Sequence, residues 1–225
     1  KEREQVEIDA VDNTAPKIDK DIIGPHLTCE EVEGNGENGH NSPGDLLRDI
    51  TMSSDVGAFT NVGVAFDGTV LYVPDETTVI KLISPTDGSK VGELATSPAV
   101  NLGAMAYDAK RNVIWACSNG APNKLYKLEL DGTTILIDST LPGSHFHFCD
   151  GLAYDENDPS SDSDDRLWFS PDVSSTIYLL DLNGNELDSF VFNPAISSFG
   201  SSGIAVGGDD LYLANNGGNQ IFRVD

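Results

Sequence analysis

Small, apolar, aromatic and acidic positions follow one another in a five-residue pattern that occurs four times along this chain. The pattern is Gly or Ala, an apolar residue, Ala, an aromatic residue and Asp, and the fourth copy departs from it at its last two positions. The copies occupy residues 63–67, 104–108, 151–155 and 203–207. A segment that recurs at intervals of about 40 to 50 residues indicates a repeat architecture, in which each repeat folds as the same small unit.

The residues after each copy also repeat. A short apolar strand comes first, then a polar turn, and then a third strand in which apolar and polar residues alternate. The third strands are predicted at 79–82, 125–128, 177–180 and 221–224. In three repeats an Asp-Gly or Asn-Gly pair follows, and such pairs adopt the positive φ that two-residue hairpin turns require. Fourth strands are predicted near 91–95, 135–139 and 187–192.

Four antiparallel strands per repeat, with small residues in the first strand, predict an all-β fold. Small residues suit strands that crowd around a common axis, so the sequence predicts a β-propeller of about four four-stranded blades. A β-sandwich also has short strands and regular turns, but it does not require the same anchor in every repeat. The blades are predicted near 55–98, 99–142, 143–196 and 197–225.

The last repeat stops after its third strand, at Asp225. A bare strand edge invites aggregation, so we predict that residues 46–53 pair with the last blade and close it. The propeller domain would then span 46–225, with residues 1–45 as an N-terminal arm. The alternatives are a chain that continues into further blades and a neighbouring subunit that supplies the missing strand.

The strand motifs resemble those of known propeller families. Leu-Tyr-Val-Pro-Asp at 71–75 and Leu-Tyr-Leu-Ala-Asn at 211–215 resemble the Tyr-Val-Thr-Asn (YVTN) repeat, and the anchor is similar to that of NHL-type and gluconolactonase-like propellers. The resemblance covers about residues 55–225. It implies a propeller fold, which serves binding modules, scaffolds and a minority of enzymes.

Gluconolactonase-like enzymes hold a metal near the axis with Glu, Asn and Asp, and the resemblance implies a candidate ring on one face of the propeller. The candidates occupy equivalent turns, one per blade: Asp75, Asn119, Asp172 and Asn215. The catalytic Glu of that family has no match here. The alternative interpretation is that these side chains cap their turns, as Asn and Asp often do.

The chain is strongly acidic, with 37 Asp and Glu against 13 Lys and Arg and a formal net charge of -24. Nucleic acid and anionic membrane surfaces repel such a chain, so we exclude both as main partners. No apolar run approaches the ~20 residues that a membrane span needs. The charge indicates either a solvated surface in an extracellular medium or an affinity for divalent cations.

Six carboxylates gather within residues 155–165, between the first two strands of the third repeat. Ca²⁺ binds six to eight oxygen ligands and would relieve their mutual repulsion, although the spacing is not that of an EF-hand. The candidate ligands are Asp155, Asn157, Asp158, Asp162, Asp164 and Asp165. A solvated acidic loop is the alternative.

A second cluster precedes the third anchor. In an extended segment His145, His147 and Cys149 project to one face, and imidazole and thiolate suit Zn²⁺ or copper. The alternative is that the intervening Phe residues pack between blades while the His side chains face solvent. Cys149 is also a candidate for a disulfide with Cys117, which would leave Cys29 over.

Residues 4–11 alternate polar and apolar side chains and predict one strand in the arm. This strand either packs on its own propeller or adds to another copy by β-augmentation. The chain begins at Lys1 without an initiator Met, so we expect either a processed mature chain or only the ordered part of one. No nucleophile elbow, phosphate loop or zinc-protease motif is present. The sequence therefore predicts a secreted or cell-surface module for binding or structure, non-enzymatic and self-assembling into a filament or surface layer. A metal-dependent lactonase is the alternative.

Overall fold

The computed structural model describes residues 50–54, 56, 63–75, 77–138, 140–143, 148–157, 160–161, 163–192, 199–216, 218 and 220–225. These residues form antiparallel sheets joined by turns, and they contain no helix that is long and apolar enough to cross a membrane. The arm 1–45, including the strand predicted at 4–11, lies outside the described residues and stays a prediction.

Three of the sheets have four strands, and within the described residues the last has three. The first consists of β1 (Ala65–Phe66), β2 (Leu71–Pro74), β3 (Val79–Ile83) and β4 (Lys90–Ala95). The second consists of β5 (Leu102–Asp108), β6 (Val113–Ser118), β7 (Leu125–Glu129) and β8 (Thr134–Asp138). The third consists of β9 (Cys149–Asp155), β10 (Arg166–Pro171), β11 (Thr176–Leu180) and β12 (Glu186–Val191). The last consists of β13 (Ser201–Gly207), β14 (Asp210–Asn215) and β15 (Ile221–Val224).

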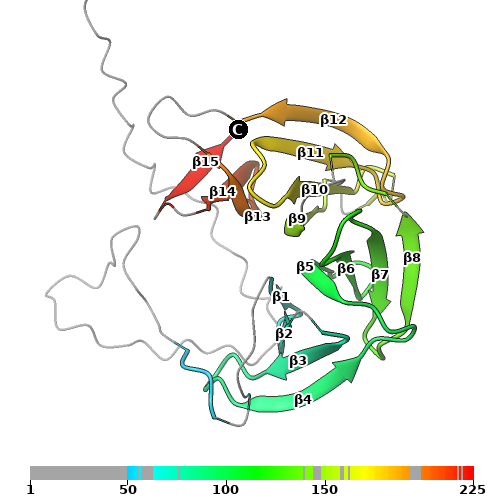
Figure 1. The fold of residues 1–225 in the computed structure, drawn as a ribbon, viewed down its shortest axis with the longest axis vertical. Coiled ribbons are helices and arrows are strands. Elements are labelled where there is room, and N and C mark those ends of the chain that lie inside the picture. Colours follow the sequence, from blue (N-terminus) through cyan, green and yellow to red (C-terminus); the bar gives the residue numbers. More distant parts are fainter. Residues whose placement is uncertain are drawn as a thin grey trace, which may run out of the picture. The chain divides into compact units, whose positions relative to one another are not determined.

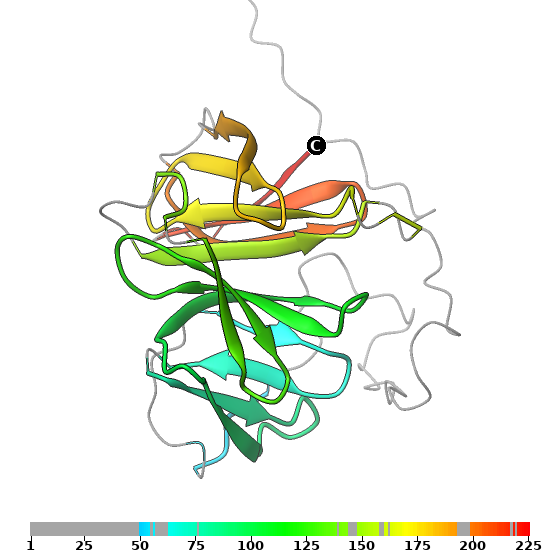
Figure 2. The same ribbon diagram turned by 90° about the vertical axis from the view of Figure 1, so that its right-hand side faces the viewer.

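The sheets are the blades of a four-bladed propeller, which confirms the predicted all-β fold. The first strands β1, β5, β9 and β13 lie innermost, and β4, β8 and β12 lie at the rim (Figure 1). Seen from the side, the sheets stack face to face as successive blades (Figure 2). The four anchors of the sequence therefore coincide with the strands around the axis.

Apolar side chains fill the spaces between neighbouring blades. Between the second and third blades, Leu125, Leu152, Leu167 and Phe169 belong to one buried cluster with Trp115. Burying a side chain of this size contributes roughly 1.5–3 kcal/mol. A second cluster joins the first two blades around Ile114 and Leu128, and a third joins the last two around Phe199 and Leu213. Each of these three interfaces is therefore an apolar core of its own.

The predicted closing segment is described only from residue 50 onward. There Ser53 donates from its backbone N–H to the carbonyl of Gly88 at 3.1 Å, and Thr51 lies against the same glycine. Residues 50–53 thus contact the turn between β3 and β4 of the first blade. The pairing of 46–49 with β15 lies outside the described residues and stays a prediction.

The hairpin glycines adopt the positive φ that their sequence predicts, and Gly132 also lies against a neighbouring blade. Its φ is 95°, and its carbonyl accepts a hydrogen bond from the N–H of Ser97 at 2.9 Å. A Cβ at this position would collide with the carbonyl of Ala95. Gly132 therefore serves both the turn and the contact between the first two blades.

We expect Gly132→Ala to lower the free energy of unfolding by about 2 kcal/mol or more, because left-handed strain and the collision add. Gly68 is the matched control: its φ is 92°, but no atom lies within 4 Å of its would-be Cβ. Gly68→Ala should cost only the strain, about 1 kcal/mol. Urea denaturation of both variants measures the difference, and equal losses would contradict a packing role for Gly132.

Candidate functional site

A cavity of about 460 Å³ opens around the propeller axis. All four blades contribute to it. The lining residues come from the anchor strands or their flanks, apart from Asn216, which follows β14. The described lining residues are Gly63, Val64, Ala104, Met105, Asp150, Leu152, Ser202, Gly203, Ile204 and Asn216. The volume lies within the range of about 300–1,000 Å³ that is typical of small-molecule sites.

The small anchor residues explain why the innermost strands can lie so close together. A Cβ on Gly63 would lie 2.9 Å from the Cα of Ala104, and a Cβ on Gly103 would lie 2.7 Å from the carbonyl oxygen of Cys149. Real Cβ atoms do not approach other atoms this closely. Glycine at these positions lets the first, second and third blades converge on the axis.

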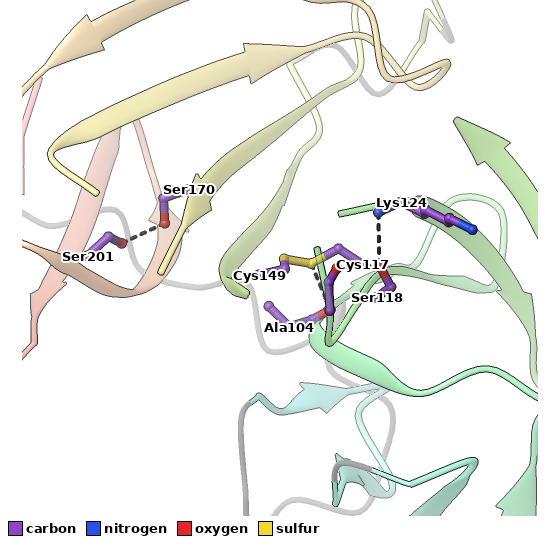
Figure 3. Close-up of a disulfide and its surroundings, with 8 residues drawn as sticks. Ala104, Cys117, Ser118, Lys124, Cys149, Ser170 and Ser201 are labelled. Atoms are coloured by element: carbon purple, nitrogen blue, oxygen red, sulfur yellow. Dashed lines mark hydrogen bonds between the residues drawn. A yellow bond between two sulfur atoms is a disulfide. The ribbon is translucent and has the colours of Figure 1, made fainter. Parts of the chain in front are cut away.

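Polar groups gather at one end of the cavity, where β9 and β13 begin. Asp150 and Ser202 line the cavity there, and the Asn216 amide donates to Asp172 Oδ1 at 3.4 Å. The hydroxyls of Ser170 and Ser201, both fully buried, are hydrogen-bonded to each other at 2.6 Å (Figure 3). This bond connects β10 to β13 and fixes the mutual position of the last two blades at the polar end.

The backbone at this end has one unusual residue. Val173 has a φ of 48°, a left-handed conformation that β-branched residues avoid, and its side chain is 52% exposed. Its N–H donates to the Ser201 carbonyl at 3.1 Å, and the Ser201 N–H donates to the Ser174 carbonyl at 2.8 Å. These two bonds between the third and fourth blades hold the strained turn in place.

None of the four residues of the predicted ring is among the described residues that line the cavity, and the ring stays a prediction. Asp75 pairs with Lys81 at 3.2 Å. The Asn215 side chain accepts from the Gly200 N–H and donates to Gln220, both at 3.2 Å. Both side chains therefore have partners within their own blades.

The two other members of the ring differ in their distance from the cavity. The Asn119 backbone N–H donates to the Asn101 carbonyl at 3.0 Å, within the loops of the second blade. Asp172 is connected to the cavity through Asn216. Of the four predicted residues, Asp172 is therefore the one that the described contacts link to the cavity.

The acidic loop 155–165 is anchored by protein cations and an indole at its two ends. Asp155 accepts a hydrogen bond from the Trp168 indole at 3.2 Å. Asp165 is bound by Arg111 at 2.6 Å and by Lys110 at 3.3 Å, and both basic residues come from the turn between β5 and β6 of the preceding blade. Asp165 therefore links the third blade to the second, whereas the contact of Asp155 with Trp168 lies within the third blade.

The remaining candidates for Ca²⁺ lie elsewhere on the loop. Asp164 accepts from the Ser163 hydroxyl at 3.1 Å, and Asn157 lines a second groove, whereas Asp158 and Asp162 lie outside the described residues. No group of three or more His, Cys, Asp or Glu side chains in the described ranges has the geometry to hold a metal ion. The calcium site stays a prediction.

The ion pairs of Asp165 set the pKa of its carboxyl group. Burial alone would raise this pKa, but hydrogen bonds from Arg111, Tyr154 and Lys110 outweigh it and hold the pKa below its usual value. Desolvation likewise works against the charged form of Arg111, but hydrogen bonds to Asp108 and Asp165 raise its pKa. The carboxylate and the guanidinium are therefore both charged at neutral pH.

Of the two roles predicted for Cys149, a disulfide or a metal ligand, the structure shows the disulfide. Cys117, at the end of β6, is bonded to Cys149, at the start of β9, with 6.0 Å between their Cα atoms (Figure 3). A sulfur in a disulfide has no thiolate to offer a metal, which removes Cys149 from the proposed transition-metal ligands. His145 and His147 lie outside the described residues.

Sequence reasoning missed the apolar walls of the cavity. Met105, Leu152 and Ile204 occupy the second position of their anchors and are indistinguishable in sequence from ordinary strand residues. Their common position within the repeat is the signal that could have found them. Only the arrangement of the four blades around the axis shows that this position lines the cavity.

Comparisons with known proteins agree on the fold. No protein-family model and no curated protein matches the chain. A glutaminyl cyclase from Myxococcus xanthus is similar over 80% of this chain and 71% of its own, with a TM-score of 0.59 and 11% identity. The WD40 repeats of RRP9 match 70% of this chain with a TM-score of 0.48 and 9% identity.

The designed protein Ika4 matches 78% of this chain and 97% of its own, with a TM-score of 0.44 and 11% identity. The chain spans less than half of the RRP9 and U3-55K structures, 45% and 46% of their lengths. At such identities a likeness concerns the backbone alone. The similarity to the glutaminyl cyclase, with its TM-score of 0.59, therefore concerns the fold alone.

Proposed function

We propose that the chain is a secreted, non-enzymatic propeller for binding and structure that associates with further copies by strand addition. The observation that carries this proposal is the edge of β15. In the other three sheets the third strand is paired on both sides, whereas within the described residues β15 pairs with β14 alone. A free edge presents a row of backbone donors and acceptors to an incoming strand.

The side chains of β15 make this edge suitable for an additional strand. Ile221 is 73% exposed, and Phe222 packs edge-on against Phe192 and Phe199, with ring centroids 5.2 and 5.9 Å away. In the third blade, β12 contributes Phe190 to the apolar core between blades. A strand beside β15 would take the corresponding place and add apolar side chains to this core.

Residues 4–11 of a second copy are the proposed strand donor. Their alternation of polar and apolar side chains matches the requirement of an edge, with one face on the propeller and one in solvent. The buried disulfide supports the secreted part of the proposal, because disulfides persist in oxidising compartments. The charge of -24 suits an extracellular surface.

We expect Ile221→Lys to abolish or strongly weaken the association, because a lysine on an edge strand opposes the addition of another strand. Val191→Lys is the matched control, since Val191 is 66% exposed at the end of the rim strand β12. Light scattering coupled to size exclusion measures the mass of each protein. Equal masses for the two variants and the wild type would overturn the proposal.

Deletion of residues 1–30 tests the donor separately, because it leaves 46–53 available for closure within the chain. We expect the truncated protein to be monomeric and the full chain to form larger particles. A monomeric full chain, with Ile221→Lys lowering its thermal stability, would instead show that the chain closes its own last blade. That outcome would reject the assembly and retain the propeller.

A further inference from the structure

The central cavity combines apolar walls with a single negative charge. Val64, Met105, Leu152 and Ile204 provide the apolar surface, one residue from each blade. Asp150 is the only charged side chain among the described residues that line the cavity. Its position, next to the first residue of β9, places the carboxylate at the polar end.

This composition decides between classes of ligand. An anion finds no Lys or Arg among the described lining residues, and the charge of -24 repels it. A calcium ion requires six to eight oxygen ligands, far more than one carboxylate with Ser202 and Asn216 can supply. An organic cation needs one negative group for its charge and apolar surface for its body.

We propose that the central cavity binds a small organic ammonium ion. The ammonium group is hydrogen-bonded to the Asp150 carboxylate, and the apolar body lies against Met105, Leu152 and Ile204. Asp150 already has a partner within the structure. A carboxylate offers about four lone-pair sites, so it accepts the ligand without giving up that partner.

Two exposed apolar residues lie close in sequence to residues that line or contact the cavity. Phe148 and Val173 are each 52% exposed beside Asp172, whose backbone N–H donates to the Phe148 carbonyl at 2.7 Å. The left-handed φ of Val173 holds its side chain out of the core at a conformational cost.

Isothermal titration with three isosteric probes tests the charge requirement on the wild-type protein. The probes are phenethylamine, a cation at neutral pH, the neutral 2-phenylethanol and the anion phenylacetate. We expect saturable binding of phenethylamine, binding of 2-phenylethanol at least about tenfold weaker, and no heat from phenylacetate. Equal binding of the cation and the anion, or no saturable binding of phenethylamine, would overturn the proposal.

Paired variants locate the site. Asp150→Asn should weaken phenethylamine binding at least about tenfold. Asp209→Asn makes the same charge change at the exposed turn between β13 and β14, and it should leave the affinity unchanged. Equal losses in the two variants would show a general effect of net charge and reject the site.

A cavity-filling variant provides a test that does not depend on Asp150. Val64 lines the cavity yet is 51% exposed, so Val64→Trp fills space without disturbing the apolar core. The control is Val91→Trp on the rim strand β4, where the replaced side chain is 55% exposed. We expect phenethylamine binding to be lost only in Val64→Trp, and wild-type affinity in that variant would place the ligand elsewhere.

Discussion

Replacement of Arg111 by Ala is expected to lower the free energy of unfolding by about 3–5 kcal/mol, the range for breaking a buried ion pair by removing one partner. Arg111 contacts Asp108 Oδ2 at 2.8 Å and Asp165 Oδ2 at 2.6 Å. Both carboxylate side chains are fully buried, on neighbouring blades. Without the guanidinium, two negative charges remain in the interior close to each other.

The remaining partners of these carboxylates limit the loss. Lys110 stays 3.3 Å from Asp165, and the Trp115 indole donates to Asp108 at 3.1 Å. Neither replaces the bridge between the blades, so we expect the apolar contacts of Trp115 to loosen as well. Urea denaturation followed by tryptophan fluorescence measures the change.

Lys127→Ala is the matched control for this variant. Lys127 pairs with Glu129 at 2.8 Å, but their side chains are 29% and 38% exposed, so the pair is worth at most about 1 kcal/mol. A similar loss in both variants would mean that Arg111 acts as an ordinary surface residue.

The same ion pair predicts a dependence of stability on pH. The pKa of Asp165 is lower in the folded protein than in the unfolded chain, where an Asp carboxyl has a pKa of about 3.9. Its stabilising contribution is therefore complete above about pH 4 and is lost as the pH falls through the folded-state value. We expect the stability of the wild type to decline below this pH more steeply than that of Arg111→Ala. Parallel decline in urea denaturation series at acid pH would contradict the role of Asp165.

Local patterns were sufficient to predict the blades. Positive φ at Gly88, Gly132 and Gly184 follows from Asp-Gly and Asn-Gly pairs, because these turns are determined by two residues. The innermost position of the anchors follows from their small residues, which permit close approach at the axis. Turn chemistry and strand alternation act over a few residues, and a single sequence contains them completely.

Contacts between blades could not be predicted in this way. Asp165 is one carboxylate among six in its loop, and the sequence does not show which of them meets a cation 54 positions away. Which carboxylate binds the cations depends on how the turn that contains Lys110 and Arg111 is placed against the third blade. The walls of the cavity could not be predicted for the same reason. Met105 and Ile204 line a common space only once the four blades are arranged around the axis.

The disulfide between Cys117 and Cys149 is expected to contribute about 3.5–4 kcal/mol to stability, as estimated from the entropy of closing a loop of this length. The two residues are 32 positions apart, and both sulfur-bearing side chains are fully buried between the second and third blades. The disulfide reduces the number of conformations open to the unfolded chain. It also joins β9 to β6 in the folded protein. Its loss should therefore weaken the interface between these blades first.

The double variant Cys117→Ala and Cys149→Ala measures this contribution without the use of a reductant. We expect its midpoint of urea denaturation to fall, and hydrogen exchange to rise first in β6 and β9, while β3 and β14 keep their protection. Cys29→Ser is the control, because it removes a thiol and leaves the disulfide intact. If the double variant were no less stable than Cys29→Ser, packing alone would hold the second and third blades together. Cys149 directly precedes Asp150 in β9. Loss of the disulfide should therefore also increase the mobility of Asp150 at the polar end of the central cavity.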